Sequence, residues 1–251
     1  MRRASSLLFV LALSGCAASQ PRTPAPPQTP TTPRTAAPGT PARTLPNDLK
    51  WVRDAAEYQA LFLQTYRAAT ARVEQQAPSR TRGSWAVVLD ADETIISNLP
   101  YQIERGRQGL GYTSESWNAW VKRREATPLP GAAAFLSRVR ELGGRIAIVT
   151  NRLGSECDDT EAVFRAHALV YDVMLCRPDG TPSDKNARFA SVARGQAFGT
   201  SAAIDVVAYV GDNILDFPGL TQQIRKSGER GFPEFGVRFF ILPNPMYGSW
   251  Q

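Results

Sequence analysis

Short apolar stretches alternate with longer amphipathic stretches along most of the chain. The short stretches are rich in valine, isoleucine and phenylalanine, a pattern typical of strands that are buried on both faces. We expect five of them, at residues 86–90, 145–152, 171–176, 205–213 and 236–242. Between them, amphipathic periodicity predicts helices at residues 131–144, 159–170 and 184–195. The alternation predicts an α/β fold, with a largely parallel sheet and helices on both faces.

A further helix is expected before the first strand. Apolar residues recur at steps of three and four from Val52 to Ala69, which makes one apolar face. Asn47 and Asp48 are both suitable residues to cap the start of this helix. We interpret it as a packing helix.

Polar residues follow three of the predicted strands at the same end of each. The first strand ends in Asp90, the second in Thr150-Asn151-Arg152, and the fourth in Gly211-Asp212-Asn213. In parallel α/β sheets, ligands bind at the carboxyl ends of the strands. The three strand ends together therefore predict an active site at this edge of the sheet.

The connection that follows the first strand is much longer than the few residues it needs. It carries four large aromatic residues, Tyr101, Tyr112, Trp117 and Trp120. An aromatic insertion above the polar edge of a sheet suggests a small cap, at about residues 99–128, that closes a pocket. The alternative is a loop that packs only on itself.

The net charge of +6 is unevenly distributed along the 251 residues. The first 46 residues contain five arginines and no acidic residue, so the rest of the chain has 24 basic and 23 acidic residues. A nearly neutral body lacks the basic surface that binds a polyanion. The charge distribution therefore argues against DNA or RNA as the main partner.

The N-terminus has the features of a bacterial export signal. Two arginines precede an apolar run, Leu7–Leu13, which is too short to span a bilayer. The following Gly15-Cys16 resembles the end of the bacterial lipoprotein box, so we expect residues 1–15 to be a signal peptide and Cys16 to be lipidated. The alternative is an ordinary signal peptide with an incidental cysteine. Ala17, in place of aspartate, favours the outer membrane by resemblance to the lipoprotein sorting rule.

Residues 16–46 are expected to form a tether and not a fold. Nine of the 19 prolines of the chain fall in this segment, mixed with threonine and alanine. Such a composition has little to bury and favours a semi-extended chain. The predicted protein is exported and lipid-anchored at the outer membrane, facing the periplasm or the cell surface, with a folded domain at residues 47–251.

Asp90 and Asp92 lie two residues apart where the first strand ends. Two carboxylates this close repel each other, so they either share a proton or hold a cation. Mg²⁺ fits, because it prefers an octahedron of oxygen ligands. Asp212 would supply another carboxylate from a neighbouring strand end. Asp216, one helical turn later, would bind the ion directly or orient its waters.

Several classes of hydrolase are excluded by what the chain lacks. Its only histidine is His167, in an amphipathic stretch where a structural role is expected. Sites that need several histidines, such as those of zinc or di-iron phosphatases and histidine phosphatases, are therefore excluded, and Ser-His-Asp hydrolases with them. The sequence also lacks a glycine-rich phosphate loop with its lysine.

Four motifs in order resemble those of the haloacid-dehalogenase superfamily of phosphohydrolases. They are DADET at residues 90–94, Thr150, Lys185, and GDNILD at residues 211–216. The segments LDADETIISNLPY, PLPGA, TNR, DKNARF and LPNPMYGSW resemble one branch more closely, the class C lipoprotein acid phosphatases and outer-membrane lipoprotein 5′-nucleotidases. The resemblance covers about residues 48–251 and implies a haloacid-dehalogenase-like, Rossmann-type fold. Ala91 departs from the branch, where a larger apolar residue such as leucine is expected.

The resemblance implies a role for each residue of these motifs. Asp90 would attack phosphorus and form an aspartyl-phosphate. Asp92 would give the metal its backbone carbonyl, while its side chain acts as acid and then as base. The metal would be Mg²⁺, held by Asp90, Asp92, Asp212 and Asp216. The phosphate would be bound by Thr94, which also shapes the loop, and by Thr150, Asn151 and Lys185.

Two of these assignments have open alternatives. Thr150-Asn151 would also serve as a helix N-cap. Lys185 would also be accounted for as a solvated lysine at the start of a helix.

The resemblance further implies an acid phosphatase for phosphomonoesters, especially nucleoside 5′-monophosphates and nicotinamide mononucleotide. Trp117 and Tyr247 match the two aromatics that grip the base in that branch; the alternative is that both are ordinary core or lid aromatics. A protonated Asp92 would place the activity maximum at mildly acidic pH. Two other interpretations stay open: a broad or sugar-phosphate phosphatase, and a non-catalytic nucleotide-binding surface lipoprotein.

Cys157 and Cys176 are the two cysteines left after lipidation of Cys16. An exported protein can join them, but the sequence leaves this disulfide open. It also leaves open the oligomeric state, including a homodimer, and the physiological substrate.

Overall fold

The computed structural model describes residues 44–251. The predicted signal peptide, Cys16 and nearly all of the predicted tether lie outside the described residues and stay predictions. Within residues 44–251, every helix is too short or too polar to cross a bilayer.

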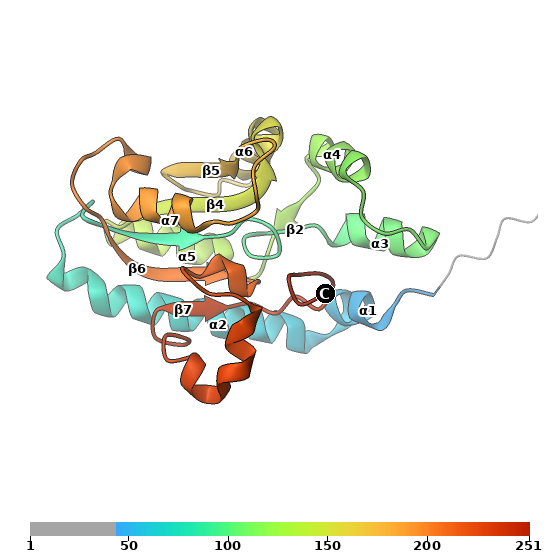
Figure 1. The fold of residues 1–251 in the computed structure, drawn as a ribbon, viewed down its shortest axis with the longest axis horizontal. Helices are drawn as coiled ribbons and strands as arrows, with labels where there is room; N and C mark the ends of the chain where they lie inside the picture. Colours follow the sequence, from blue (N-terminus) through green and yellow to red (C-terminus); the bar gives the residue numbers. More distant parts are fainter. Residues whose placement is uncertain (1–43) are drawn as a thin grey trace, which may run out of the picture. The chain divides into compact units, whose positions relative to one another are not determined.

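A five-stranded parallel sheet forms the centre of the fold (Figure 1). Its strands are β1 (Trp85–Leu89), β4 (Arg145–Leu153), β5 (Val173–Arg177), β6 (Asp205–Gly211) and β7 (Phe239–Ile241). They are arranged in the order β5-β4-β1-β6-β7, and every neighbouring pair is parallel. The predicted parallel α/β fold is confirmed. The last strand is shorter than predicted, because Gly236 takes a left-handed turn with φ of 79° where the strand was expected to begin.

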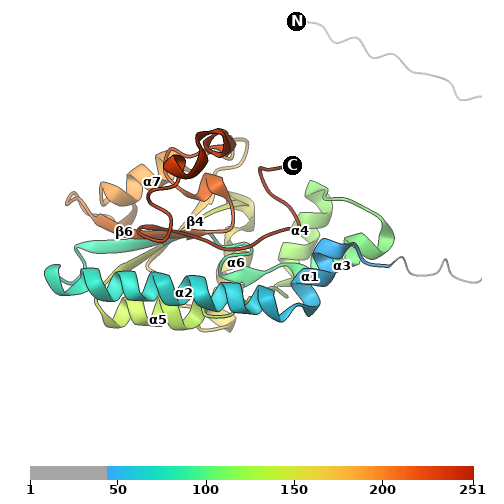
Figure 2. The same ribbon diagram turned by 90° about the horizontal axis from the view of Figure 1, so that it is seen from below.

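Helices cover both faces of this sheet, as predicted. Trp85, Val87 and Leu89 of β1 belong to a core shared with three helices, α2 (Ala56–Gln76), α5 (Ala132–Glu141) and α6 (Cys157–Ala166). Ala86 and Val88 point the other way, into a second core that includes α7 (Asn186–Ala193). Figure 2 shows α2 and α5 on one side of the sheet and α7 on the other. The continuous apolar composition of β1 follows from this two-sided burial.

The N-terminal helix differs from the prediction, because it is two helices. α1 (Asn47–Asp54) and α2 are separated by Ala55, whose backbone is extended with ψ of 127°. The break redirects α1 toward α3 (Leu99–Gln108) of the insertion, where Gly106 leaves room for Leu49. A side chain at Gly106 would lie 2.8 Å from the Leu49 methyl group. Apolar periodicity fits one helix or two, so the sequence did not reveal the break.

The long connection after β1 folds as a small cap. It contains β2 (Ile96–Ser97), α3, α4 (Ser114–Arg123) and β3 (Thr127–Pro128), and β2 pairs with β3 in antiparallel register. Tyr101 and Trp120 are each only 2% exposed and join the main core. The insertion is therefore anchored to the body of the domain by its aromatic side chains, and is not a loop packed on itself.

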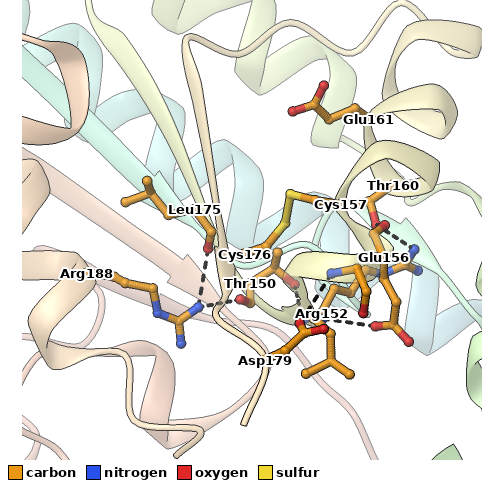
Figure 3. Close-up of a disulfide and its surroundings, with 12 residues drawn as sticks. Thr150, Arg152, Glu156, Cys157, Thr160, Glu161, Leu175, Cys176, Asp179 and Arg188 are labelled. Atoms are coloured by element: carbon orange, nitrogen blue, oxygen red, sulfur yellow. Dashed lines mark hydrogen bonds between the residues drawn. A yellow bond between two sulfur atoms is a disulfide. The ribbon is translucent and has the colours of Figure 1, made fainter. Parts of the chain in front are cut away.

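A disulfide joins Cys157 and Cys176 (Figure 3). The Cα atoms are 6.1 Å apart, and the bond ties the first residue of α6 to β5. The sequence left this pairing open, because nothing in the spacing of 19 residues fixes how close the two elements come.

Candidate active site

The register of the sheet brings the three predicted strand ends to one level. Leu89 of β1 pairs with Ile148 of β4 and with Val210 of β6. The next backbone N–H, that of Asp90, donates to the Val210 carbonyl at 3.1 Å. Residues just beyond these pairs, including Asp212, therefore emerge side by side at one edge of the sheet.

A cavity of about 740 Å³ opens at this edge. Its walls include the acids Asp90, Asp92, Asp212 and Asp216, together with Asn151 and Lys185. Trp117 from α4 and Tyr247 from the C-terminal segment also line it. The fold thus brings together, around one cavity, residues that were predicted from widely separated parts of the chain.

Lys185 is the central cation of this cluster. Its side chain is 2% exposed, and its Nζ donates to Asp90 Oδ1 and to Asp216 Oδ1, both at 2.6 Å. Burial alone would lower the pKa of Lys185, but Asp216 and Asp90 together raise it above its ordinary value, so it stays protonated. The alternative of a solvated helix-start lysine does not fit this burial.

Three carboxylates crowd around this single lysine. Oxygens of Asp90, Asp212 and Asp216 all lie within 4.8 Å of one another. Burial raises the pKa of Asp90 to about 7 against the opposing effect of Lys185, and neighbouring acids add to the rise. Burial, with Asp216 and Asp90, also raises the pKa of Asp212 well above its ordinary value. One lysine leaves an excess of two negative charges when all three acids ionise, which a divalent cation would neutralise.

Asp216 is held by the protein through both of its oxygens. Oδ1 accepts from Lys185, and Oδ2 accepts from the backbone N–H of Asn213 at 2.9 Å. Gly211 makes this arrangement possible, since a Cβ there would lie 2.3 Å from the Asp216 Cβ. These contacts fix the orientation of Asp216 within the group of three acids that could hold an ion.

Thr94 lies behind the acids and does not line the cavity. It is fully buried, and its hydroxyl donates to Asp212 Oδ1 at 3.2 Å. Its carbonyl accepts from the Tyr66 hydroxyl at 2.8 Å. On the opposite oxygen of Asp212, Asn244 donates at 2.8 Å. This placement favours the loop-shaping role of Thr94 over contact with a phosphate.

Of the predicted Thr150-Asn151 pair, Thr150 is buried in the protein and Asn151 lines the cavity. Thr150 is fully buried, and its hydroxyl accepts from the backbone N–H of Arg152 at 3.1 Å. Asn151 lines the cavity, and its Oδ1 accepts from Arg188 at 2.6 Å. Arg188 also donates to the carbonyls of Thr150 and Leu175 (Figure 3). With Oδ1 occupied, the amide N–H₂ of Asn151 is the end left to donate to a bound anion.

Asp92 faces a buried arginine, Arg152, which the sequence placed at a strand end without a predicted role. Arg152 has a side chain 1% exposed, and its Nη2 lies 2.8 Å from Asp92 Oδ1. Asn98 donates to the same oxygen at 2.8 Å. Arg152 stands in the TNR segment directly after Asn151, but its charge is typical of a solvated surface residue. The only available signal was its position at the end of a buried strand.

Glu93, next to Asp92, is a further buried acid without a predicted role. It is fully buried and accepts from the backbone N–H and the side-chain amide of Asn98 at 2.7 and 3.2 Å. Burial, with the charge of Asp92, raises the pKa of Glu93 to about 8. Glu93 therefore keeps its proton, and stays uncharged, up to about pH 8.

The sequence matches the family described as HAD superfamily, subfamily IIIB (acid phosphatase), over residues 27–250. The fold and the match together define a phosphomonoester hydrolase of the haloacid-dehalogenase superfamily. Within that superfamily, the chain belongs to the subfamily IIIB acid phosphatases. Enzymes of this superfamily generally use a divalent metal, in agreement with the cluster of three acids.

Solved structures place the chain near the class C acid phosphatases. The class C acid phosphatase from Bacillus anthracis is 28% identical, with a TM-score of 0.70, over 81% of this chain and 85% of that chain. Its structure with tungstate bound gives a TM-score of 0.71 at the same identity and coverage. The resemblance inferred from the motifs is confirmed.

Plant proteins are also similar in sequence. The stem 28 kDa glycoprotein of Glycine max is 26% identical over 189 residues, which are 72% of this chain and 69% of that protein. Acid phosphatase 1 of Solanum lycopersicum is 25% identical over 166 residues, which are 64% of this chain and 57% of that protein. The chain thus spans less than two thirds of the tomato protein.

The raised pKa values predict how stability depends on pH in the metal-free protein. Folded Asp90 and Glu93 hold protons up to about pH 7 and pH 8, whereas unfolded chains release them near pH 4. The folded state therefore binds more protons over this window, and the free energy of unfolding falls as pH rises. We expect the Tm of EDTA-treated protein to be lower at about pH 8 than at about pH 5. Added Mg²⁺ should raise the Tm more at the higher pH, where the ion does not compete with protons.

Thermal unfolding followed by circular dichroism checks this dependence. The Asp90→Asn variant is the control, because it removes one of the titrating groups and should show a shallower pH dependence. A Tm that rises from pH 5 to pH 8 without metal would contradict the prediction.

Proposed function

We propose that this protein is a Mg²⁺-dependent acid phosphatase that hydrolyses nucleoside 5′-monophosphates through an aspartyl-phosphate on Asp90. The observation that carries the proposal is the position of the Asp90 carboxylate. It lies at the end of the central strand, 2.6 Å from buried Lys185, on the wall of a cavity that aromatic side chains also line. From this position the carboxylate can attack the phosphorus of an ester bound in the cavity.

The proposed reaction has two steps. In the first, an oxygen of Asp90 attacks phosphorus, the ester P–O bond breaks, and its electron pair passes to the leaving oxygen. Asp92, on the same cavity wall, donates the proton that the leaving oxygen takes up. In the second step, Asp92 takes a proton from water, which attacks phosphorus and releases phosphate and the free Asp90 carboxylate.

Lys185 and Asn151 would bind the transferred phosphoryl group. Lys185 carries a fixed positive charge beside Asp90, and Asn151 offers the amide N–H₂ that Arg188 leaves free. Preorganised donors of this kind stabilise the charge that develops on the phosphoryl oxygens. The structure of the class C acid phosphatase from Bacillus anthracis with tungstate bound supports the binding of an oxyanion by this fold.

Asp90 and Asp212, with the backbone carbonyl of Asp92, would hold the Mg²⁺ ion. The available donors are oxygens, which suits a hard cation. When bound, the ion would reduce the repulsion between the Asp90 carboxylate and the phosphate. Asp216, held by Lys185 and a backbone N–H, would keep the neighbouring side chains oriented.

The proposed substrate class rests on the aromatic walls of the cavity. Its volume of about 740 Å³ lies within the usual range for small-molecule sites. Trp117 and Tyr247, which are far apart in the sequence, both line this cavity. Stacking on such rings binds a planar base with little regard to its identity. The proposal therefore extends to nicotinamide mononucleotide, which also joins a planar ring to a 5′-phosphate.

We further propose that the protein is exported and anchored to the outer membrane through lipidated Cys16. The disulfide between Cys157 and Cys176 supports export, because disulfides persist in oxidising compartments such as the periplasm.

The Asp90→Asn variant tests the covalent mechanism. Asparagine keeps the size of the side chain but removes the nucleophile, so we expect turnover of p-nitrophenyl phosphate to fall at least about 1,000-fold. EDTA should abolish wild-type activity, and added Mg²⁺ should restore it. Asp205→Asn is a matched control, because Asp205 forms an exposed ion pair with Arg80 at the other end of β6. Near-normal activity of the Asp90 variant would exclude the proposed intermediate.

The Trp117→Ala variant tests the substrate class. Loss of stacking should lower kcat/KM for nucleoside 5′-monophosphates by about 10- to 100-fold, since stacking contributes about 1–3 kcal/mol per base. The kcat/KM for glycerol phosphate, which has no ring, should fall far less. The Trp117→Phe variant should retain most of the activity on nucleoside 5′-monophosphates. Equal losses on both substrates would show that Trp117 does not bind the base.

Replacement of Cys16 tests the anchor. In a bacterial host, wild-type protein should sediment with the outer membrane, and Cys16→Ser should move to the soluble periplasmic fraction, because acyl chains supply the membrane affinity. Phosphatase activity in each fraction reports the location. A soluble wild-type protein, or a variant that still sediments with the membrane, would count against lipidation at Cys16.

A further inference from the structure

Arg152 is a charged side chain in an unusually buried place. It lies near the end of β4, and its side chain is 1% exposed. Burial of a guanidinium costs several kcal/mol unless partners satisfy it, and a well-packed apolar side chain would often be as stable there. Because an apolar side chain would often be as stable, the presence of a charge this deeply buried indicates a functional role for Arg152.

Every nitrogen of the guanidinium has a partner. Nε donates to the two carboxylate oxygens of Asp92 at 2.9 and 3.2 Å, and Nη2 lies 2.8 Å from Asp92 Oδ1. Nη1 donates to the Thr160 hydroxyl at 3.1 Å, and Nη2 also donates to Asn98 Oδ1 at 3.0 Å. Thr160 in turn donates to the Glu156 carbonyl at 2.8 Å, which fixes the direction of its hydroxyl. The planar fork is locked against rotation.

Asn98 holds Asp92 from the cap side. Its Nδ2 donates to Asp92 Oδ1 at 2.8 Å, while its Oδ1 accepts from Trp120 Nε1 at 2.8 Å as well as from Arg152. Asn98 precedes α3, and Trp120 belongs to α4. The Asp92 carboxylate is thus hydrogen-bonded by Arg152 of the sheet and by Asn98 at the base of the cap.

Arg152 also touches the wall of the substrate cavity. The carbon at the centre of its guanidinium lies 5.4 Å from the centroid of the Trp117 ring. Trp117 lines the cavity, so the same arginine supports an aromatic wall and the carboxylate that faces the reacting group.

We propose that Arg152 is a positioning residue that holds the Asp92 carboxylate in the orientation needed to protonate the leaving group. The proposal rests on the proposed function, because it takes Asp92 as the acid of the first step. Arg152 does not touch the reacting atoms; it acts through Asp92, and Asn98 shares the task from the cap side.

The test compares two phosphomonoesters that differ in their need for an acid. Glycerol phosphate releases an alkoxide, which must be protonated, whereas 2,4-dinitrophenyl phosphate releases a stable phenolate without a proton. kcat/KM reports the first step for both. For Arg152→Met, which keeps the length and removes the charge, we expect a loss of about 100-fold on glycerol phosphate. The loss on the dinitrophenyl ester should be only a few-fold.

Three further variants make the result specific. Asp92→Asn should show the same selective loss, and the double variant should be no worse than Asp92→Asn on glycerol phosphate, because the two residues act as one unit. Arg123→Met is the matched control, since Arg123 lies over the Trp120 ring and forms exposed ion pairs but does not touch Asp92. It should show no selectivity between the two esters.

Each alternative outcome is distinguishable. Equal losses on both esters for Arg152→Met, or additive losses in the double variant, would overturn the proposal and assign Arg152 a purely structural role. If Arg152→Met does not fold, Arg152→Lys carries the test: it keeps the charge without the fork, so a smaller but still selective loss supports the proposal and an unselective loss overturns it. A wild type inactive on both esters, or an unselective Asp92→Asn, would overturn the proposed mechanism and this inference with it.

Discussion

The ion pairs of buried Lys185 with Asp90 and Asp216 are the constraint on which the rest of the site depends. One ammonium group bridges two carboxylates at 2.6 Å each, and the side chain of Lys185 is only 2% exposed. Removal of one partner from such an arrangement typically costs about 3–5 kcal/mol, because it leaves an unpaired charge in the interior. The site therefore concentrates charge, with an excess of acids that a divalent cation would balance.

The parallel sheet makes this concentration of charge possible. Its strands are apolar on both faces, so the helices secure them, and their carboxyl ends align in register. Gly211 shows how tight the convergence is, since only a residue without Cβ lets Asp216 turn back toward Lys185.

Two hydrogen-bond networks lie around the cavity. One joins Lys185 to Asp90 and Asp216. The other joins Asp92 to Arg152 and Asn98. The second network reaches the cap through Trp120. A carboxylate in each network gives the enzyme two acids in different surroundings, which is what the proposed division between nucleophile and acid–base requires.

The sequence by itself determined the α/β class, the order of the main elements and the acids at the strand ends, because apolar periodicity and strand-end polarity are local properties of the chain. It did not determine the break at Ala55, the disulfide, or the duties of Thr94, Arg152 and Asn98. The local sequence does not reveal whether an arginine or a threonine is solvated or buried. Only the tertiary structure decided those roles, since they depend on which distant side chains arrive beside them. Burial then sets the energetic cost of leaving each charge or hydrogen bond unpaired.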